Sequence, residues 1–310
     1  AGPTGSARTD APRGLRTMAT DLQTPFDAAV VIFTKRTGTL AAAVRSVWAQ
    51  QFHGRVQVVV GVDGPDADRE ALAALAREVP ATMALTVIDP GYSTARSRGG
   101  LYAPEAGGSL RTALTLLANA RHVAYLSEFN RYAPNHLADL KHAIGDRAWA
   151  FALRWFADAR TGEVICRDEW ESVGPAGGVY GKSEGGFVAA DALLIDKFAC
   201  HGVIAAWADA DAQGRGEDRR FYRAIRGMPN AATGEPSVYA SIRLENQHPF
   251  MLAQFRSHGV MLERYLTLSP ELKAQIAHAA EAQRAHAESV RSTLSVGGVD
   301  FGMKPPRPRT

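Results

Sequence analysis

Cysteine is scarce in this sequence, with only Cys166 and Cys200 among 310 residues. Two thiols cannot build a disulfide framework, and without a C-x-x-C spacing they do not predict a zinc site. The sequence contains no run of about 18 apolar residues and no visible signal-peptide pattern, so no membrane span is predicted. We therefore expect reduced thiols and a cytoplasmic location, with peripheral contact to a membrane surface left open.

The sequence also lacks a large excess of either charge. The chain has 35 Lys and Arg residues against 32 Asp and Glu residues, a net charge of +3, and its basic residues are scattered. This excess fits an anionic small-molecule ligand or a lipid surface, but it is too small to predict a nucleic-acid partner. Hydrophobic residues make up 46% and charged residues 22%, which indicates a globular protein.

Short apolar runs alternate with helical patterns in the first half of the chain. Residues 28–33, 56–62 and 83–88 are predicted strands, and residues 39–51 and 66–78 between them have helical spacing. Strands and helices that alternate at this distance predict βαβ units. We expect an α/β fold with a mostly parallel central sheet and flanking helices.

The remaining pattern predicts one domain with a helical extension. Further helices are predicted at 109–119, 134–144 and 216–226, further strands at 122–126, 149–156 and 162–166, and a strand followed by a helix at 185–195. A last helix at 269–294 begins with a Ser cap and a Pro. We expect a flexible leader or tag remnant at 1–25, the main domain at 26–265, and the C-terminal helix with a loose tail at 266–310.

Polar residues follow the predicted strands, where an open parallel sheet binds its ligands. Asp63 is a candidate for the base or the ribose of a nucleotide, and arginines are the natural partners of a diphosphate. The candidates for binding a nucleotide sugar are Thr34, Arg36, Asp63, Arg96, Arg98, Arg111 and Glu128.

Five segments of residues 28–225 together resemble the family-2 glycosyltransferases of the GT-A fold. They are VVIFTKRTGTLAAAVRSVWAQQF followed by VVVGVDG, then GGSLRTALTLLANARHVAYL, then GGFVAADALLIDK, and last GRGEDRRFYRAI. The resemblance implies a Rossmann-like GT-A domain that binds a UDP-type or GDP-type sugar. It also implies inverting transfer of that sugar to a hydroxyl acceptor, with Asp218 as general base and Glu217 positioning it or the acceptor.

The sequence departs from the family at the metal motif. The family's Asp-x-Asp pair holds a divalent cation, Mn²⁺ or Mg²⁺, and the matching tripeptide here is Ser127-Glu128-Phe129. Phenylalanine offers no oxygen to a hard cation. Three interpretations stay open: a shifted oxygen site at Glu128 and Asn130, replacement of the cation by Arg131, or loss of catalysis. A late histidine, His248, is a further metal candidate near the diphosphate.

Aromatic and acidic residues in the second half are candidates for the acceptor. Trp170 and Glu171 lie in an acidic aromatic segment, and Trp207 precedes the Glu-Asp pair by ten residues. The alternatives are an anchoring tryptophan and core packing. At the level of function, the alternative to an enzyme is a sugar-nucleotide-binding protein without turnover. A sugar-1-phosphate nucleotidyltransferase is disfavoured, because the Gly-rich loop it needs after the first strand is missing. The sequence predicts neither the acceptor nor the oligomeric state.

Overall fold

The computed structural model describes residues 22–35, 38–65 and 68–296, with side chains up to residue 285. The chain forms two compact units, Ala1–Ile242 and Arg243–Thr310. The division therefore falls at residue 242, whereas the sequence analysis placed the start of the C-terminal extension at 266. Most of the expected leader and the end of the expected tail lie outside the described residues.

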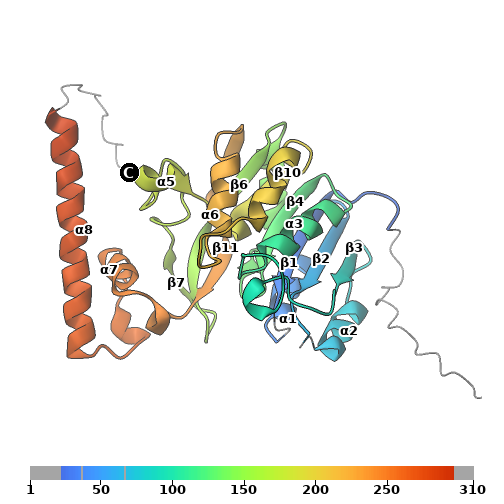
Figure 1. Ribbon diagram of the computed structural model, residues 1–310, viewed down its shortest axis with the longest axis horizontal. Coiled ribbons are helices and arrows are strands. Elements are labelled where there is room, and N and C mark those ends of the chain that lie inside the picture. The colour runs from blue at the N-terminus through green and yellow to red at the C-terminus, as the bar shows by residue number, and fades with distance from the viewer. Residues whose placement is uncertain (1–21, 36–37, 66–67, 297–310) are drawn as a thin grey trace, which may run out of the picture. The chain divides into compact units, whose positions relative to one another are not determined.

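Four parallel strands form one half of the central sheet of the first unit, in the order β3-β2-β1-β4 (Figure 1). They are β1 (Ala28–Thr34), β2 (Val56–Val62), β3 (Met83–Ile88) and β4 (His122–Ser127). The connecting helices are α1 (Leu40–Trp48), α2 (Arg69–Arg77) and α3 (Gly108–Leu117). Every residue of β2 is buried, as expected for a strand covered on both faces. These elements confirm the predicted βαβ units.

The sheet continues beyond β4 with strands of both directions. Its order there is β10 (Leu193–Asp196), β6 (Trp149–Asp158), β11 (Asn230–Ile242) and β5 (Arg131–Tyr132), and β7 (Val164–Arg167) pairs with β6. Since β10 is antiparallel to both β4 and β6, β6 has the direction of the first four strands, and β11 is parallel to it. Only β10, β5 and β7 are reversed, so the predicted mostly parallel sheet is confirmed.

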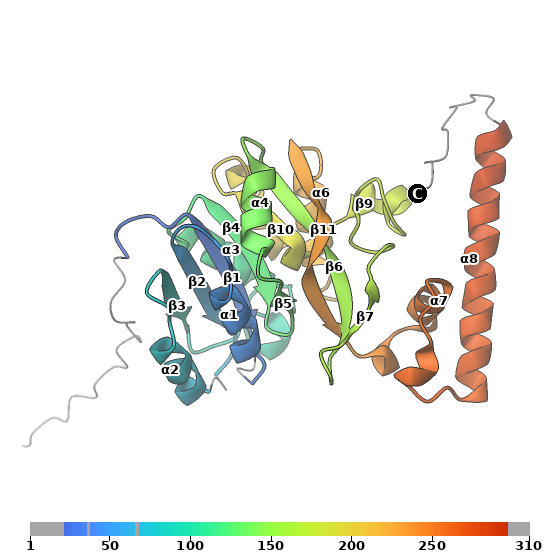
Figure 2. The same cartoon turned by 180° about the vertical axis from the view of Figure 1, so that it is seen from behind.

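Helices cover both faces of this sheet. Figure 1 shows α3 and α6 (Glu217–Ile225) on one face, and Figure 2 shows α4 (His136–Ile144) on the other, against β6 and β11. A short hairpin of β8 (Gly174–Pro175) and β9 (Gly186–Phe187) encloses the one-turn helix α5 (Gly181–Glu184). No helix in the described part of the chain is long and apolar enough to cross a bilayer.

One prediction for the second half of this unit was wrong, and one strand was missed. After β9, residues up to 195 form a short 3-10 turn (Ala190–Ala192) and then strand β10, not a helix. The 13-residue strand β11 was missed, because Gly234 and Pro236 interrupt its sequence. Its pairing with β6 shifts register at Pro236, where a ladder lacks an N–H donor.

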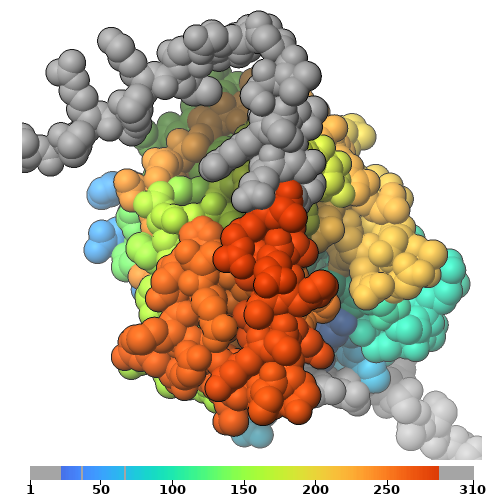
Figure 3. Space-filling view, turned by 90° about the vertical axis from the view of Figure 1, so that its left-hand side faces the viewer, coloured from blue at the N-terminus to red at the C-terminus, as the bar shows by residue number. Residues whose placement is uncertain are grey.

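The second unit is helical in its described residues. It contains α7 (Pro249–Ser257) and α8 (Pro270–Val296), and Figure 3 shows the two helices side by side, in orange and red. The predicted helix at 269–294 is confirmed, with Pro270 as its first residue. Ile276 of α8 and Phe255 of α7 are fully buried in this packing.

Candidate functional site

The ends of β1 and β4 are joined by the carboxylate of Glu128, which is only 4% exposed. Its Oε2 accepts hydrogen bonds from the hydroxyls of Thr34 at 2.7 Å and Thr39 at 3.2 Å, and its Oε1 accepts from the backbone N–H of Lys35 at 3.2 Å. Thr34 is itself fully buried. Glu128 and Thr34 therefore fix the loop after β1, and the Thr34 hydroxyl does not face a ligand as the sequence analysis expected.

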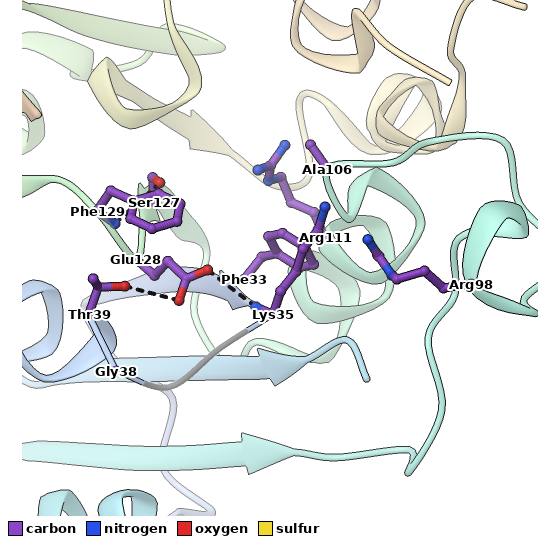
Figure 4. Close-up of a pocket in the computed structure, with 10 residues that line it drawn as sticks. All are labelled: Phe33, Lys35, Gly38, Thr39, Arg98, Ala106, Arg111, Ser127, Glu128 and Phe129. Carbon is purple, nitrogen blue, oxygen red and sulfur yellow. Dashed lines mark hydrogen bonds between the residues drawn. The ribbon is translucent and has the colours of Figure 1, made fainter. Parts of the chain in front are cut away.

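A cavity of about 770 Å³ lies at these strand ends (Figure 4). We call it the basic cavity, and it is lined by Phe33, Lys35, Gly38, Thr39, Arg98, Ala106, Arg111, Ser127, Glu128 and Phe129. Figure 4 shows Arg98 and Phe129 on opposite sides of it. Its size is sufficient for a ligand larger than a single sugar ring. Three of its ten lining residues are cations, so an anionic ligand is favoured.

Two of the cations in the basic cavity have no ion-pair partner among the described residues. They are Lys35, which follows β1, and Arg111, in α3. Burial and the nearby charge of Arg98 lower the pKa of Lys35 below its usual value. Arg111 instead lies over the Trp207 ring, with 4.5 Å between its guanidinium carbon and the ring centre. Neither side chain is therefore held in a salt bridge within the described residues, although carboxylates of neighbouring segments lie near both.

The third cation, Arg98, is held by Asp63 at the end of β2. Asp63 is 1% exposed and binds the Arg98 guanidinium, the Ser93 hydroxyl at 3.1 Å, and the backbone N–H and hydroxyl of Thr94 at 2.5 and 2.9 Å. Asp63 does not line the basic cavity. This corrects its predicted contact with the nucleotide, because a carboxylate with four donors has no free oxygen lone pair facing the cavity. Its role is to place Arg98.

The other predicted diphosphate ligands do not join this group. Arg96 is exposed and donates to the Leu101 carbonyl at 3.3 Å, away from the basic cavity. The prediction for Arg96 is wrong. Arg96 and Arg98 are two positions apart in a 3-10 turn, so their side chains point in different directions. Arg36 lies outside the described residues.

A second cavity, of about 440 Å³, shares Lys35, Ala106, Arg111 and Ser127 with the basic cavity. We call it the carboxylate cleft, because its lining includes Glu105, Glu171, Asp191, Glu217 and Asp218. Both members of the predicted Glu-Asp pair are therefore present, at the first two positions of α6. Of the predicted acceptor residues, Glu171 also lines this cleft. The two cavities meet at Arg111.

Glu217 is the most buried carboxylate of the carboxylate cleft, at 4% exposed, and its Oε1 has no hydrogen-bond partner in the described residues. Burial raises its pKa above the usual value of 4.5. Asp218 is less buried, and its Oδ1 accepts the backbone N–H of Arg219 at 2.8 Å. The two acids thus differ in solvation, with Asp218 the one open to a ligand.

The two predicted acceptor tryptophans are corrected by their burial. Trp207 is 0% exposed and stacks on Phe221 with 4.1 Å between ring centres, and Trp170 is 3% exposed and packs on Phe156. A sugar cannot reach either ring face. The alternatives, core packing for Trp207 and an anchoring tryptophan for Trp170, agree with this burial.

The metal candidates are not assembled into one site. The Asn130 amide donates to Asp191 at 2.5 Å and accepts the backbone N–H of Ser241 at 2.9 Å, so both of its polar atoms are engaged. His248 belongs to the second unit, where its Nδ1 accepts the Phe250 N–H as the cap of α7. Arg131 donates to the Gly162 carbonyl and lines a different cavity. Among the described residues, no three His, Cys, Asp or Glu side chains are grouped to hold a metal.

Three residues of the site were not singled out in the sequence. Lys35 lies beside Arg36 in a loop, where no periodicity indicates which side chain enters a cavity. Asp191 accepts the backbone N–H of Ser127 at 2.5 Å, which connects the 3-10 turn before β10 to the end of β4. Arg154, in β6, is buried between Asp168 and Glu171, with 2.7 Å from its Nε to Asp168. A buried strand arginine was the available signal, since such a charge needs a partner.

Comparison with solved structures shows the fold. Residues 1–349 of S. aureus TarS match with a TM-score of 0.51 and 14% identity, over 82% of this chain and 78% of that one. The same fragment in complex with UDP matches with a TM-score of 0.50 and 11% identity, over 82% and 70%. The chain thus has the mixed α/β fold of GT-A glycosyltransferases. No protein-family model and no curated protein sequence matches it.

Proposed function

We propose that this chain is a glycosyltransferase that takes a sugar from a nucleoside diphosphate and transfers it to a hydroxyl acceptor. The observation that carries the proposal is the junction, at Lys35 and Arg111, of the basic cavity with a cleft whose lining holds five carboxylates beside four basic residues. A transferase needs a cationic site for the diphosphate and a carboxylate site for the acceptor, with the reacting carbon between them. Fold alone does not establish this activity, so the residues of the site must support it.

The basic cavity is the proposed donor site. Its unpaired cations, Lys35 and Arg111, suit the two negative charges of a diphosphate, and charge-assisted hydrogen bonds to such groups are among the strongest in proteins. The fold is shared with a TarS fragment whose structure holds UDP, so we infer a UDP-type donor.

The carboxylate cleft is the proposed acceptor site, with Asp218 as general base. The acceptor oxygen attacks the anomeric carbon and its proton passes to Asp218, while the bond from that carbon to the diphosphate oxygen breaks. A base in one cavity and a leaving group in the other lie on opposite sides of the reacting carbon, so the configuration is inverted. Glu217 orients the acceptor or Asp218.

Replacement of Asp218 by Asn tests this assignment. We expect the release of UDP from UDP-sugars, in the presence of hydroxyl acceptors, to fall by about 10²–10⁴-fold, the usual contribution of a general base. Calorimetric binding of UDP stays unchanged. Asp211 is a matched control, because it lies in the preceding turn and does not line either cavity, and Asp211→Asn retains activity. Full transfer by Asp218→Asn contradicts the proposed base.

The second candidate function is a sugar-nucleotide-binding protein without turnover. Phe129 favours it, because this residue is 58% exposed on the wall of the basic cavity at the position of a metal-binding acid. If the chain binds UDP but neither hydrolyses any UDP-sugar nor transfers its sugar, this candidate is favoured over the enzyme.

A further inference from the structure

We propose that this chain neutralises the diphosphate of its ligand with Lys35, Arg98 and Arg111, in place of a divalent cation. The inference rests on the proposed function, since it concerns how the donor site holds a nucleoside diphosphate. In this fold the ligands of a metal would come from the end of β4, so the oxygen atoms there decide whether a metal can bind.

The residues at the end of β4 do not fit a hard cation. Mg²⁺ and Mn²⁺ prefer oxygen ligands, with Mg²⁺ close to an octahedron of six. Phe129 supplies no donor atom, and both Glu128 oxygens already accept hydrogen bonds, from Thr34, Thr39 and the Lys35 backbone. With three bonds accepted, the Glu128 carboxylate keeps at most one free lone pair, on Oε1, so it offers a metal a single ligand unless these bonds are lost.

The remaining oxygens nearby are engaged as well. Asp191 accepts from the Ser127 N–H and the Asn130 amide, and the Asn130 carbonyl oxygen accepts from Ser241. Ser127 lines both cavities, and its hydroxyl oxygen, a neutral ligand, accepts the backbone N–H of Phe129 at 3.4 Å. A neutral hydroxyl alone cannot bring a divalent cation to the diphosphate.

The positive charge that a metal would contribute is present on side chains. Lys35 and Arg111 have no ion-pair partner among the described residues, and Arg98 is fixed from behind by Asp63. Burial and the nearby charge of Arg98 lower the pKa of Lys35, so keeping this lysine charged costs free energy, which an anion in the same cavity offsets.

The three cations come from three separate segments. Lys35 follows β1, Arg98 lies in the loop after β3, and Arg111 lies in α3, one turn from the N-terminus of the helix. Figure 4 shows the three side chains on the same side of the basic cavity. Arg111 also lines the carboxylate cleft, so it lies where the diphosphate would separate from the sugar. A guanidinium there binds two oxygens at once and keeps its charge at every physiological pH.

The test is calorimetric titration of the full chain with UDP, in excess EDTA and again in excess manganese. The proposal expects the same Kd, within about twofold, in the two conditions. It also expects Lys35→Met to weaken UDP binding about tenfold, as the loss of one charge-assisted contact does, and Lys35→Arg to restore most of it. Arg96→Met is the matched control, since Arg96 is in the same loop as Arg98 but outside the cavity, and it leaves the Kd unchanged.

The outcomes separate this inference from the proposed function. UDP binding that requires manganese overturns the inference and leaves the glycosyltransferase proposal intact. If UDP binds without metal and Lys35→Met does not weaken that binding, the proposed role of this lysine is overturned. Absence of UDP binding in both conditions overturns both proposals. Thermal unfolding of each variant verifies the fold, and the metal comparison uses the unmodified chain, so it does not depend on any variant being stable.

Discussion

Arg111 lies over the indole of Trp207, with its guanidinium carbon 4.5 Å from the ring centre. Trp207 in turn stacks on Phe221 of α6, the helix whose first two residues are Glu217 and Asp218. One aromatic pair thus supports both the cation of the donor site and the acids of the acceptor site. The distance between the two sets of charges is fixed by core packing.

Trp207→Ala is expected to be strongly destabilising. Loss of a fully buried tryptophan costs about 3–5 kcal/mol in the free energy of unfolding, measured by urea denaturation. Trp207→Phe keeps an aromatic ring that can stack on Phe221. It should therefore cost much less. Equal losses for the two variants would show that stacking is not what this site requires.

Gly108→Ala is expected to disturb the junction of the two cavities. A Cβ at Gly108 would lie 1.9 Å from the backbone oxygen of Trp207, so α3 must move away from that segment. We expect a lower Tm and weaker UDP binding. Gly202→Ala is the control, because nothing lies within 4 Å of a Cβ there. Wild-type UDP affinity in Gly108→Ala would contradict the tight packing of α3.

Glu217→Gln is expected to raise stability while it lowers activity. Burial raises the pKa of Glu217, so the folded state binds the proton more tightly than the unfolded state does. The ionised side chain therefore costs stability at neutral pH, and this cost disappears as the pH falls below the unfolded pKa. The variant should gain about 1 kcal/mol near pH 7 and little in acid, by urea denaturation.

The matched control for Glu217→Gln is Glu169→Gln, at an exposed glutamate that does not line the carboxylate cleft. Its free energy of unfolding and its activity should not change. A Glu217→Gln variant that is less stable near pH 7 would show that the carboxylate makes a stabilising contact.

UDP binding is expected to weaken on the alkaline side because of Lys35. Burial and Arg98 lower the Lys35 pKa, whereas Asp63, Glu105 and Glu217 raise it, and the net shift is downward from 10.5. The charged form, which attracts the diphosphate, is therefore lost at a lower pH than for an ordinary lysine. The phosphates of UDP do not titrate above about pH 7. The uracil N3–H does titrate on the alkaline side, so only a difference between the wild type and a variant without the lysine is assigned to Lys35.

The measurement for Lys35 is the Kd for UDP across this pH range, in the wild type and in Lys35→Arg. An arginine stays charged throughout, so its Kd should rise less with pH than that of the wild type. Parallel curves for the two proteins would assign the alkaline loss to another group.

The α/β fold and the strand ends were predictable, because the first half of the chain has the local hydrophobic patterns that are typical of strands and helices. Each of the first three predicted strands is a short buried apolar run, and each strand end has a polar residue. The strand β11 was not predictable in the same way, since Gly234 and Pro236 conceal a strand that tertiary pairing maintains across two register shifts.

Within the site, the sequence indicated which residue types were present but not how they are oriented. Asp63 follows β2 as a nucleotide ligand would, yet its partners come from a loop about 30 residues later in the chain. Trp207 is of a residue type that can stack on a sugar, but it is buried by Phe221, which belongs to a different segment of the chain. Such pairings depend on tertiary contacts that no single stretch of sequence encodes.

The four donors on Asp63 also have a thermodynamic consequence. They fix the loop that carries Arg98 when the chain folds, so the conformational entropy of this loop is lost at folding and not at binding. On this wall the chain is a preorganised receptor, which selects its ligand by shape and charge without closing around it. Association at this wall is therefore limited by diffusion and orientation rather than by a loop rearrangement.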